Sequence, residues 1–200
     1  MAGTIITIGR QYGSGGRSTG KELSKMLGIP FYDRAIVDLA AKESGLDADF
    51  ISDGEQKVTA SMLFNIAAMN YCGYFTDATN TLTDKIYLAE SKVITSIASE
   101  GPCVIVGRCA DYILRDGFNV FKVFMYASDP IRAERIMKEQ NVSEKEALKL
   151  LRQSDKRRSR HYEHYTGLSW RQPEHYDLMI DGGKIPPETA AKLIATAIAK

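Results

Sequence analysis

Short apolar runs rich in β-branched residues alternate along the chain with longer segments whose apolar residues recur at helical spacing. The runs are bounded by glycine, proline or polar residues, which is typical of buried strands. Strands separated by helices predict an α/β fold with a parallel sheet covered on both faces. The expected strands are Thr4–Ile8, Pro30–Tyr32, Val104–Val106, Val120–Tyr126 and Tyr176–Ile180.

Capping and turn residues predict where helices begin and end. One helix is expected from Ser18 to Leu27 with Gly28 as its stop, and another from about residue 35 to 43. A capping serine or a proline in the first turn predicts three more helix starts. These starts are Ser128-Asp129-Pro130, the capping-box pair Ser143 and Glu146, and Pro187.

The stretch from about Gly45 to Glu100 interrupts the alternation of strands and helices. Its apolar residues recur at roughly helical spacing, so we interpret it as a helical insert between the second and third strands. We favour a core role for this apolar stripe, and a dimer face or a substrate lid is the alternative. We treat residues 1–200 as a single domain. The stripe comprises Met62, Leu63, Ile66, Met69, Ile86, Leu88, Val93, Ile94 and Ile97.

Charge and composition exclude several classes of partner. The 200 residues carry 26 basic and 25 acidic side chains, so the formal net charge of +1 creates no overall field toward nucleic acid or membrane. No apolar run approaches transmembrane length, and we find no signal-peptide pattern at the N-terminus. Cys72, Cys103 and Cys109 include no CxxC pair, which favours free thiols in a reducing compartment. We therefore expect a cytoplasmic protein.

Residues 11–18 occupy the frame GxxxxGK[ST] of a phosphate-binding loop, between an expected strand and an expected helix. Small residues let backbone N–H groups converge on an anion, and the following helix points its positive end at the same place. Gln11 replaces the first glycine and Arg17 replaces the lysine, while Ser18 stands where a hydroxyl ligates Mg²⁺. A glycine-rich turn without a ligand is the alternative. The residues expected to hold the phosphates are Gly13, Ser14, Gly15, Gly16, Arg17, Ser18 and Thr19.

Four segments, in this order, resemble the cytidylate kinase-like family. They are Ile5–Arg17, Phe31–Arg34, Val106–Leu114, and a last segment that runs from Asp155 through Thr166-Gly167 and Trp170 to Tyr176-Asp177-Leu178. The resemblance implies a P-loop nucleoside monophosphate kinase fold with a five-stranded parallel sheet. It also implies a helical acceptor-binding insert at about 45–100, a lid at about 130–170, and ATP and Mg²⁺ as cofactors.

Three polar residues are candidates for binding the acceptor. Asp33 follows a short strand, where ligands bind at the carboxyl edge of a parallel sheet, and the resemblance implies that it holds the acceptor nucleotide. A helix N-cap is an alternative role that does not exclude the first. Arg108 follows a buried strand, and its fork suits an acceptor phosphate, with a salt bridge as the alternative. Asp111 lies close to Arg108 in the sequence and is the third candidate for binding the acceptor.

The densest basic run, Asp155–His161, falls in an expected helix. One face of this helix carries Leu151, Asp155, Arg158, Tyr162 and Tyr165, whereas Arg157 and Arg160 point elsewhere. By resemblance this is the lid, whose arginines close over the transferred phosphoryl group. Arg158 is the preferred lid arginine, and Arg132 and Arg135 are second choices. A solvated charged face is the alternative, which we favour for Arg157 and Arg160. The catalytic candidates are Arg17, Arg132 and Arg158.

These features predict an ATP-dependent phosphotransferase, with small-molecule nucleotides as its ligands. The leading hypothesis is a nucleoside monophosphate kinase acting on cytidylate or a similar acceptor. A kinase for another small phosphate-bearing or hydroxyl acceptor is a second hypothesis. A nucleotide-binding regulatory or scaffold protein without turnover is a third, and a homodimer is left open. The backbone around Gly182-Gly183-Lys184 is a candidate for contacting adenine.

Overall fold

The computed structural model describes residues 3–33 and 82–199 of the 200-residue chain. The chain divides into two compact units, of which the first combines residues 1–33 with 97–200 and the second spans 34–96. The helix expected at about 35–43 and most of the expected insert, including Cys72, lie outside the described residues. The described part of the second unit belongs to a helix, α5 (Leu82–Glu100), which runs on into the first unit.

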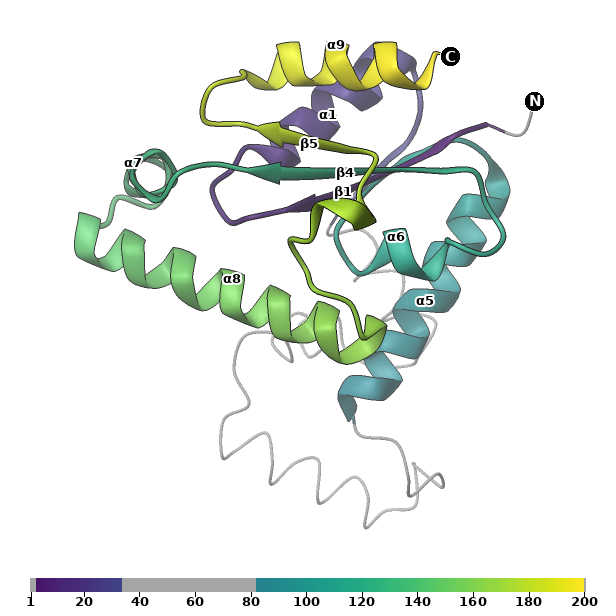
Figure 1. The fold of residues 1–200 in the computed structure, drawn as a ribbon, viewed down its shortest axis with the longest axis horizontal. Helices are drawn as coiled ribbons and strands as arrows, with labels where there is room; N and C mark the ends of the chain where they lie inside the picture. The colour runs from purple at the N-terminus through teal and green to yellow at the C-terminus, as the bar shows by residue number, and fades with distance from the viewer. Residues whose placement is uncertain (1–2, 34–81, 200) are drawn as a thin grey trace. The chain divides into compact units, whose positions relative to one another are not determined.

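A five-stranded parallel sheet forms the centre of the first unit, as predicted (Figure 1). The strands lie in the order β2-β3-β1-β4-β5, so β1, which leads into the glycine-rich loop, is central. Their bounds are β1 (Ile5–Arg10), β2 (Phe31–Tyr32), β3 (Val104–Val106), β4 (Val120–Tyr126) and β5 (Leu178–Asp181).

Two strands end later than predicted, because backbone pairing continues where the apolar run stops. Gly9 and Arg10 still pair with Phe124 and Met125, so β1 reaches Arg10 rather than ending at Ile8. Asp181 likewise pairs with Tyr126 and belongs to β5. The predicted bounds of β3 and β4 are confirmed.

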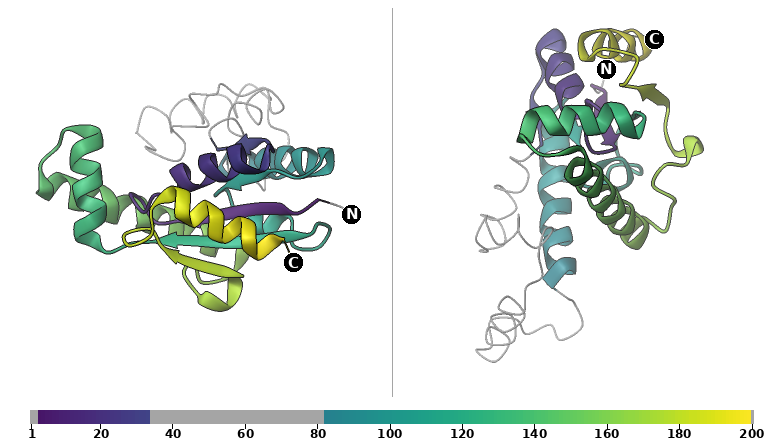
Figure 2. Two further views of the ribbon diagram at one scale, coloured as in Figure 1. Left: turned by 90° about the horizontal axis from the view of Figure 1, so that it is seen from above. Right: turned by 90° about the vertical axis from the view of Figure 1, so that its left-hand side faces the viewer.

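Helices cover both faces of this sheet (Figures 1 and 2). On one face lie α1 (Gly16–Leu27) and α9 (Pro187–Ile198), and on the other lie α6 (Ala110–Ile113) and α8 (Glu144–Thr166). The helix α7 (Asp129–Gln140) follows β4, and a short 3₁₀ turn, η1 (Pro173–His175), precedes β5. None of the described helices has the length and apolar character that crossing a membrane requires.

The predicted helix ends are largely confirmed. Gly28 ends α1 in a left-handed conformation and donates its N–H to the carbonyl of Ser24. The Ser143 hydroxyl accepts the N–H of Glu146 at the start of α8, as half of a capping box. By contrast, α1 begins at Gly16, two residues before Ser18.

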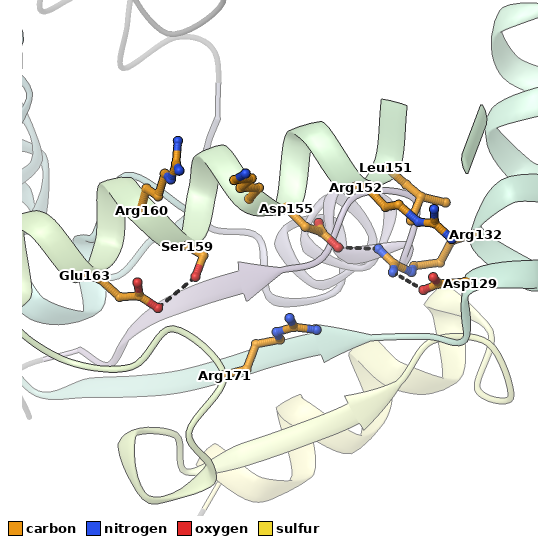
Figure 3. Close-up of a pocket in the computed structure, with 10 residues that line it drawn as sticks. Asp129, Arg132, Leu151, Arg152, Asp155, Ser159, Arg160, Glu163 and Arg171 are labelled. Carbon is orange, nitrogen blue, oxygen red and sulfur yellow. Dashed lines mark hydrogen bonds and ion pairs between the residues drawn. The ribbon is translucent and has the colours of Figure 1, made fainter. Parts of the chain in front are cut away.

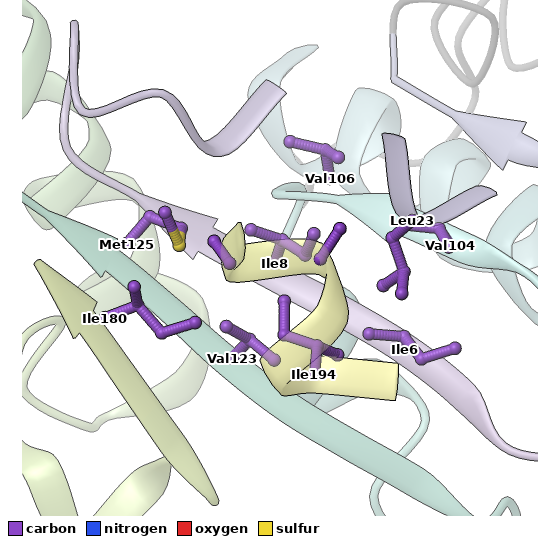
Figure 4. Packing of buried hydrophobic residues seen from close by; sticks show 11 residues of the cluster. Ile6, Ile8, Leu23, Val104, Val106, Val123, Met125, Ile180 and Ile194 are labelled. Carbon is purple, nitrogen blue, oxygen red and sulfur yellow. The ribbon is translucent and has the colours of Figure 1, made fainter. Parts of the chain in front are cut away.

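The core between the sheet and the helices α1 and α9 consists of aliphatic side chains (Figure 4). Ile6, Ile8 and Val123 of the central strands pack with Leu23 of α1 and Ile194 of α9, and all five are at most 1% exposed. Burial of such surface is the main force holding a sheet to its helices. The core therefore fixes the end of β1 and the start of α1, and the glycine-rich loop connects these two elements.

Candidate functional site

The loop between β1 and α1 has the backbone of an anion cradle. Gly13 and Gly15 adopt left-handed conformations, with φ of 74° and 88°, which only glycine adopts without strain. The first amides of α1 point out of the helix N-terminus, whose dipole favours a negative charge. Within the described part of the chain, five amides of this loop make no hydrogen bond: those of Gly13, Gly15, Gly16, Arg17 and Ser18.

Gln11, which replaces the first glycine of the motif, fastens this loop to the end of β4. Its N–H donates to the carbonyl of Met125 at 2.9 Å, and its Oε1 accepts the N–H of Ala127 at 3.1 Å. The Ser14 hydroxyl then donates to the carbonyl of Gln11 at 2.8 Å. Gln11 and Ser14 are both buried, so these bonds are shielded from water. The departure from the motif thus supplies a structural anchor.

Arg135 of α7 and Gly182 after β5 hold the loop from another side. Arg135 donates to the carbonyl of Gly13 at 3.1 Å and to the carbonyl of Gly182 at 2.7 Å. A β-carbon at position 182 would overlap the carbonyl oxygen of Ser14, so the two loops meet backbone to backbone. The predicted contact between this connection and adenine stays a prediction.

Arg132 and Asp155 bind the peptide groups of Tyr12, at the start of the loop. Arg132 is 3% exposed and donates to Asp155 at 2.6 Å and to Asp129 at 2.5 Å (Figure 3). It also donates to the carbonyl of Tyr12 at 3.1 Å. Asp155 also accepts the N–H of Tyr12 at 2.8 Å. In this arrangement Arg132 positions the loop, and its catalytic role stays a prediction.

Charged residues gather where β1, β2 and β3 end. Asp33 pairs with Arg17 at 2.6 Å and with Arg10 at 3.6 Å. The guanidinium of Arg10 packs against Gly107, the residue that precedes Arg108. A β-carbon at position 107 would overlap this guanidinium. Arg108 itself has a left-handed backbone with φ of 59°, which is strained for arginine. The carboxyl edge therefore carries Asp33 and the arginines that surround it.

Arg10 is a candidate that the sequence analysis missed. The sequence contained a signal for it, because Arg10 follows an apolar run and so is expected at the carboxyl edge of the sheet. The same argument selected Arg108. Its side chain is only partly exposed, and its carbonyl accepts a 3.1 Å hydrogen bond from Arg158.

The predicted face of α8 is confirmed. Leu151, Asp155 and Tyr162 are buried and Arg158 is half-buried, with its guanidinium carbon 5.4 Å from the centre of the Tyr12 ring. The two arginines predicted to point elsewhere, Arg157 and Arg160, are exposed.

Asp111 faces α8 rather than the glycine-rich loop. Its carboxylate accepts the Tyr162 hydroxyl at 2.7 Å. Burial raises the pKa of Asp111, and the hydrogen bond from Tyr162 opposes that rise only in part. Burial and the neighbouring Asp111 carboxylate raise the pKa of Tyr162 as well. The acceptor-binding role of Asp111 stays a prediction.

The residues around the loop fit ATP and Mg²⁺. The free amides match the acceptor oxygens of phosphates, and Ser18 is exposed in the first turn of α1. Among the described residues no group of three or more His, Cys, Asp and Glu side chains is arranged for a metal. Thr19 is fully buried, below the surface where a ligand would lie.

Sequence comparison identifies the family of this chain. The model of the cytidylate kinase-like family matches residues 5–184. A cytidylate kinase from Thermoplasma acidophilum is 24% identical over 197 residues, covering 96% of this chain and 91% of that protein. One from Methanobrevibacter smithii is 25% identical over 198 residues, covering 97% and 98%.

Solved structures share the architecture. An uncharacterized protein from Eubacterium ventriosum superposes with a TM-score of 0.73 at 27% identity, covering 98% of this chain and 99% of that one. A shikimate kinase from Acinetobacter baumannii in complex with shikimate gives a TM-score of 0.54 at 16% identity, covering 100% and 94%, which indicates a shared fold. The fold is therefore that of the α/β P-loop NTPases. With its family model matched over nearly the whole length, the chain belongs to the cytidylate kinase-like family.

Proposed function

We propose that this protein transfers a phosphoryl group from ATP to a small phosphorylated acceptor, with cytidylate as the leading candidate. Membership of the cytidylate kinase-like family supports phosphoryl transfer. The observation that carries the proposal is that five amides of Gly13–Ser18 make no hydrogen bond among the described residues, in a loop with two left-handed glycines. Such a cradle binds the phosphates of a nucleotide through the backbone and the helix dipole.

The donor side of the site consists of Gly13–Ser18. Its amides would hold the donor phosphates, and Ser18 would help to hold Mg²⁺, which neutralises phosphate charge when it is bound. Arg17 is 62% exposed and paired with Asp33, so its side chain can exchange this partner for a phosphate. An arginine at this position carries a permanent charge and a forked donor set, and it is bulkier than lysine.

The acceptor side of the site would comprise Asp33, Arg108 and Arg10. Arg108 and Arg10 would bind the acceptor phosphate, since guanidinium groups bind phosphate bidentately. Asp33 would then be released from Arg17 and would orient the acceptor. Arg158, from the lid, would neutralise charge that develops during transfer, and lid closure would exclude water.

A screen for ADP formation tests the proposal. Purified protein is incubated with ATP, Mg²⁺ and each common nucleoside monophosphate, and ADP is expected with at least one of them. Gly15→Val should abolish ATP binding and ADP formation, because a side chain at this left-handed glycine fills the cradle. Gly117→Val is the matched control, since a β-carbon there meets nothing within 4 Å.

The outcomes separate the competing hypotheses. ATP binding without ADP formation from any acceptor would favour a regulatory nucleotide-binding protein. Unchanged ATP affinity in a folded Gly15→Val protein would contradict the assignment of the loop.

A further inference from the structure

A second basic site is lined by Arg132 and Asp155 but by no residue of the glycine-rich loop. It is a cavity of about 470 Å³ between α7, α8 and the connection from α8 to β5 (Figure 3). This volume lies within the range of small-molecule sites. The residues that give the cavity its charge come from all three segments: Arg132 from α7, Arg152, Lys156 and Arg160 from α8, and Arg171 from the connection.

The cavity carries an excess of positive charge. Five basic side chains face three carboxylates, and two of those carboxylates, Asp129 and Asp155, are already bound by Arg132. The third, Glu163, accepts the Ser159 hydroxyl at 2.8 Å. Among the described residues, no ion pair engages Arg152, Lys156 or Arg160. The free charge in this cavity is therefore cationic.

Arg132, one of the residues that line the cavity, also has a buried donor with no partner among the described residues. Arg132 lines the cavity and is 3% exposed, and its Nε makes no hydrogen bond. Its two terminal nitrogens are used by Asp129, Asp155 and the carbonyl of Tyr12. A buried N–H without an acceptor is costly, so the guanidinium of Arg132 keeps one unused donor beside the cavity.

The lining also limits the kind of anion. Leu151 is the one apolar residue that lines this cavity, and five of the other nine residues are basic, so charged groups dominate the contacts that a ligand would make there. Guanidinium and ammonium groups from α7, α8 and the connection suit an anion with several charged oxygens. We propose that this cavity binds a compact polyphosphate or a similarly small multiply phosphorylated metabolite. The site is separate from the proposed phosphotransfer, and its test measures binding alone.

Trp170 provides a local reporter for this binding. It is the one tryptophan in the chain, it is buried, and Arg171 lies 5.8 Å from the centre of its ring. An anion that engages Arg171 alters the field at the indole, so titration with inorganic tripolyphosphate should change Trp170 fluorescence in a saturable way. The change should persist in Gly15→Val, in which the glycine-rich loop is blocked.

A pair of matched double variants decides the location. Lys156→Gln with Arg160→Gln should raise the dissociation constant by about tenfold or more, since two charge-assisted contacts are lost. Lys145→Gln with Arg157→Gln removes the same charge from exposed positions of α8 outside the cavity. This control should shift binding by less than about threefold, as expected for screened surface charges.

Three results would overturn the proposal. One is an equal rise of the dissociation constant in the two double variants, which would indicate a diffuse attraction of the anion to α8. Another is loss of the fluorescence change in a folded Gly15→Val protein, which would place the anion in the glycine-rich loop. The third is much tighter binding of ATP than of tripolyphosphate in Gly15→Val, which would mean that a base is recognised. If Gly15→Val does not fold, the two double variants in the otherwise wild-type protein decide the matter.

Discussion

Two residues depart from the phosphate-loop motif, and each has a specific partner. Gln11 binds the backbone of Ala127 at the end of β4, and Arg17 pairs with Asp33 at the end of β2. Both partners lie on strands or strand ends that neighbour the loop in space but not in sequence. The departures therefore change how the loop is anchored and charged, and they leave its glycine cradle intact.

The close approach of Gly182 to the loop gives a prediction at the scale of one residue. Gly182 has no left-handed backbone, so alanine is compatible with its conformation, but its β-carbon would overlap the Ser14 carbonyl oxygen. Gly182→Ala should lower the free energy of unfolding by about 1–3 kcal/mol, the usual cost of overpacking. It should also weaken ATP binding, because Ser14 must move. Urea unfolding and an ATP titration measure both effects.

Gly117 is the control for this substitution. A β-carbon there has nothing within 4 Å, so Gly117→Ala should alter stability by no more than about 0.5 kcal/mol. Equal stabilities of the two variants would show that the two loops do not meet as described.

At the scale of elements, α8 combines two roles along one helix. One face buries Leu151, Asp155 and Tyr162, and the half-buried Arg158 on that face reaches the carbonyl of Arg10 beside the glycine-rich loop. The neighbouring face lines the basic cavity. A rigid shift of α8 would therefore change both sites together, because Asp155 ties the helix to Tyr12.

Arg158 should affect turnover more than binding. A cation that stabilises a transferring phosphoryl group typically contributes about 10³–10⁵ in rate, so Arg158→Ala should lower kcat severely while changing ATP affinity little. Arg157→Ala is the control on the same helix, since Arg157 is exposed, and it should be mild. Steady-state kinetics with the acceptor found in the screen measure the split. Small and similar effects of both substitutions would assign Arg158 to a solvated face.

Local pattern predicted the elements better than it predicted their ends. The first and last residues of β3 and β4 were predicted correctly, because both strands are made almost entirely of apolar residues. The ends of β1 and β5 were wrong, because Gly9, Arg10 and Asp181 belong to strands through backbone pairing rather than apolarity. The glycines of the phosphate loop could be recognised because their spacing is local.

At the scale of the whole molecule, the supports of the site come from distant parts of the sequence. Gln11 and Ala127 are 116 residues apart, and Tyr12 and Asp155 are 143 apart. No periodicity or motif specifies such pairs, which depend on the order of strands in the sheet. The sequence therefore predicted the loop that would bind phosphate, but not Arg135 or Asp155 as the residues that hold it in place.

The pair Asp111 and Tyr162 links two helices through a half-buried carboxylate and affects the stability of the whole fold. Because burial raises the pKa of Asp111 above its ordinary value of 3.8, the folded state holds that proton more tightly than the unfolded state does. The contribution of Asp111 to stability is therefore full below the unfolded pKa. It is lost progressively as pH rises through the higher folded pKa, since the folded state must then bury a charge.

Asp111→Asn should remove this pH dependence. The asparagine cannot ionise, and its amide oxygen can still accept the Tyr162 hydroxyl. The variant should therefore gain stability relative to the wild type as pH rises from 4 to 8. The gain should be about 1.4 kcal/mol for each unit by which the pKa of Asp111 is raised in the folded wild type. Asp116→Asn is the control, because its side chain is 78% exposed, and its difference from the wild type should stay nearly constant over that range. Urea unfolding at several pH values measures the differences. A variant that loses stability relative to the wild type as pH rises would show that the pKa of Asp111 is not raised in the folded state.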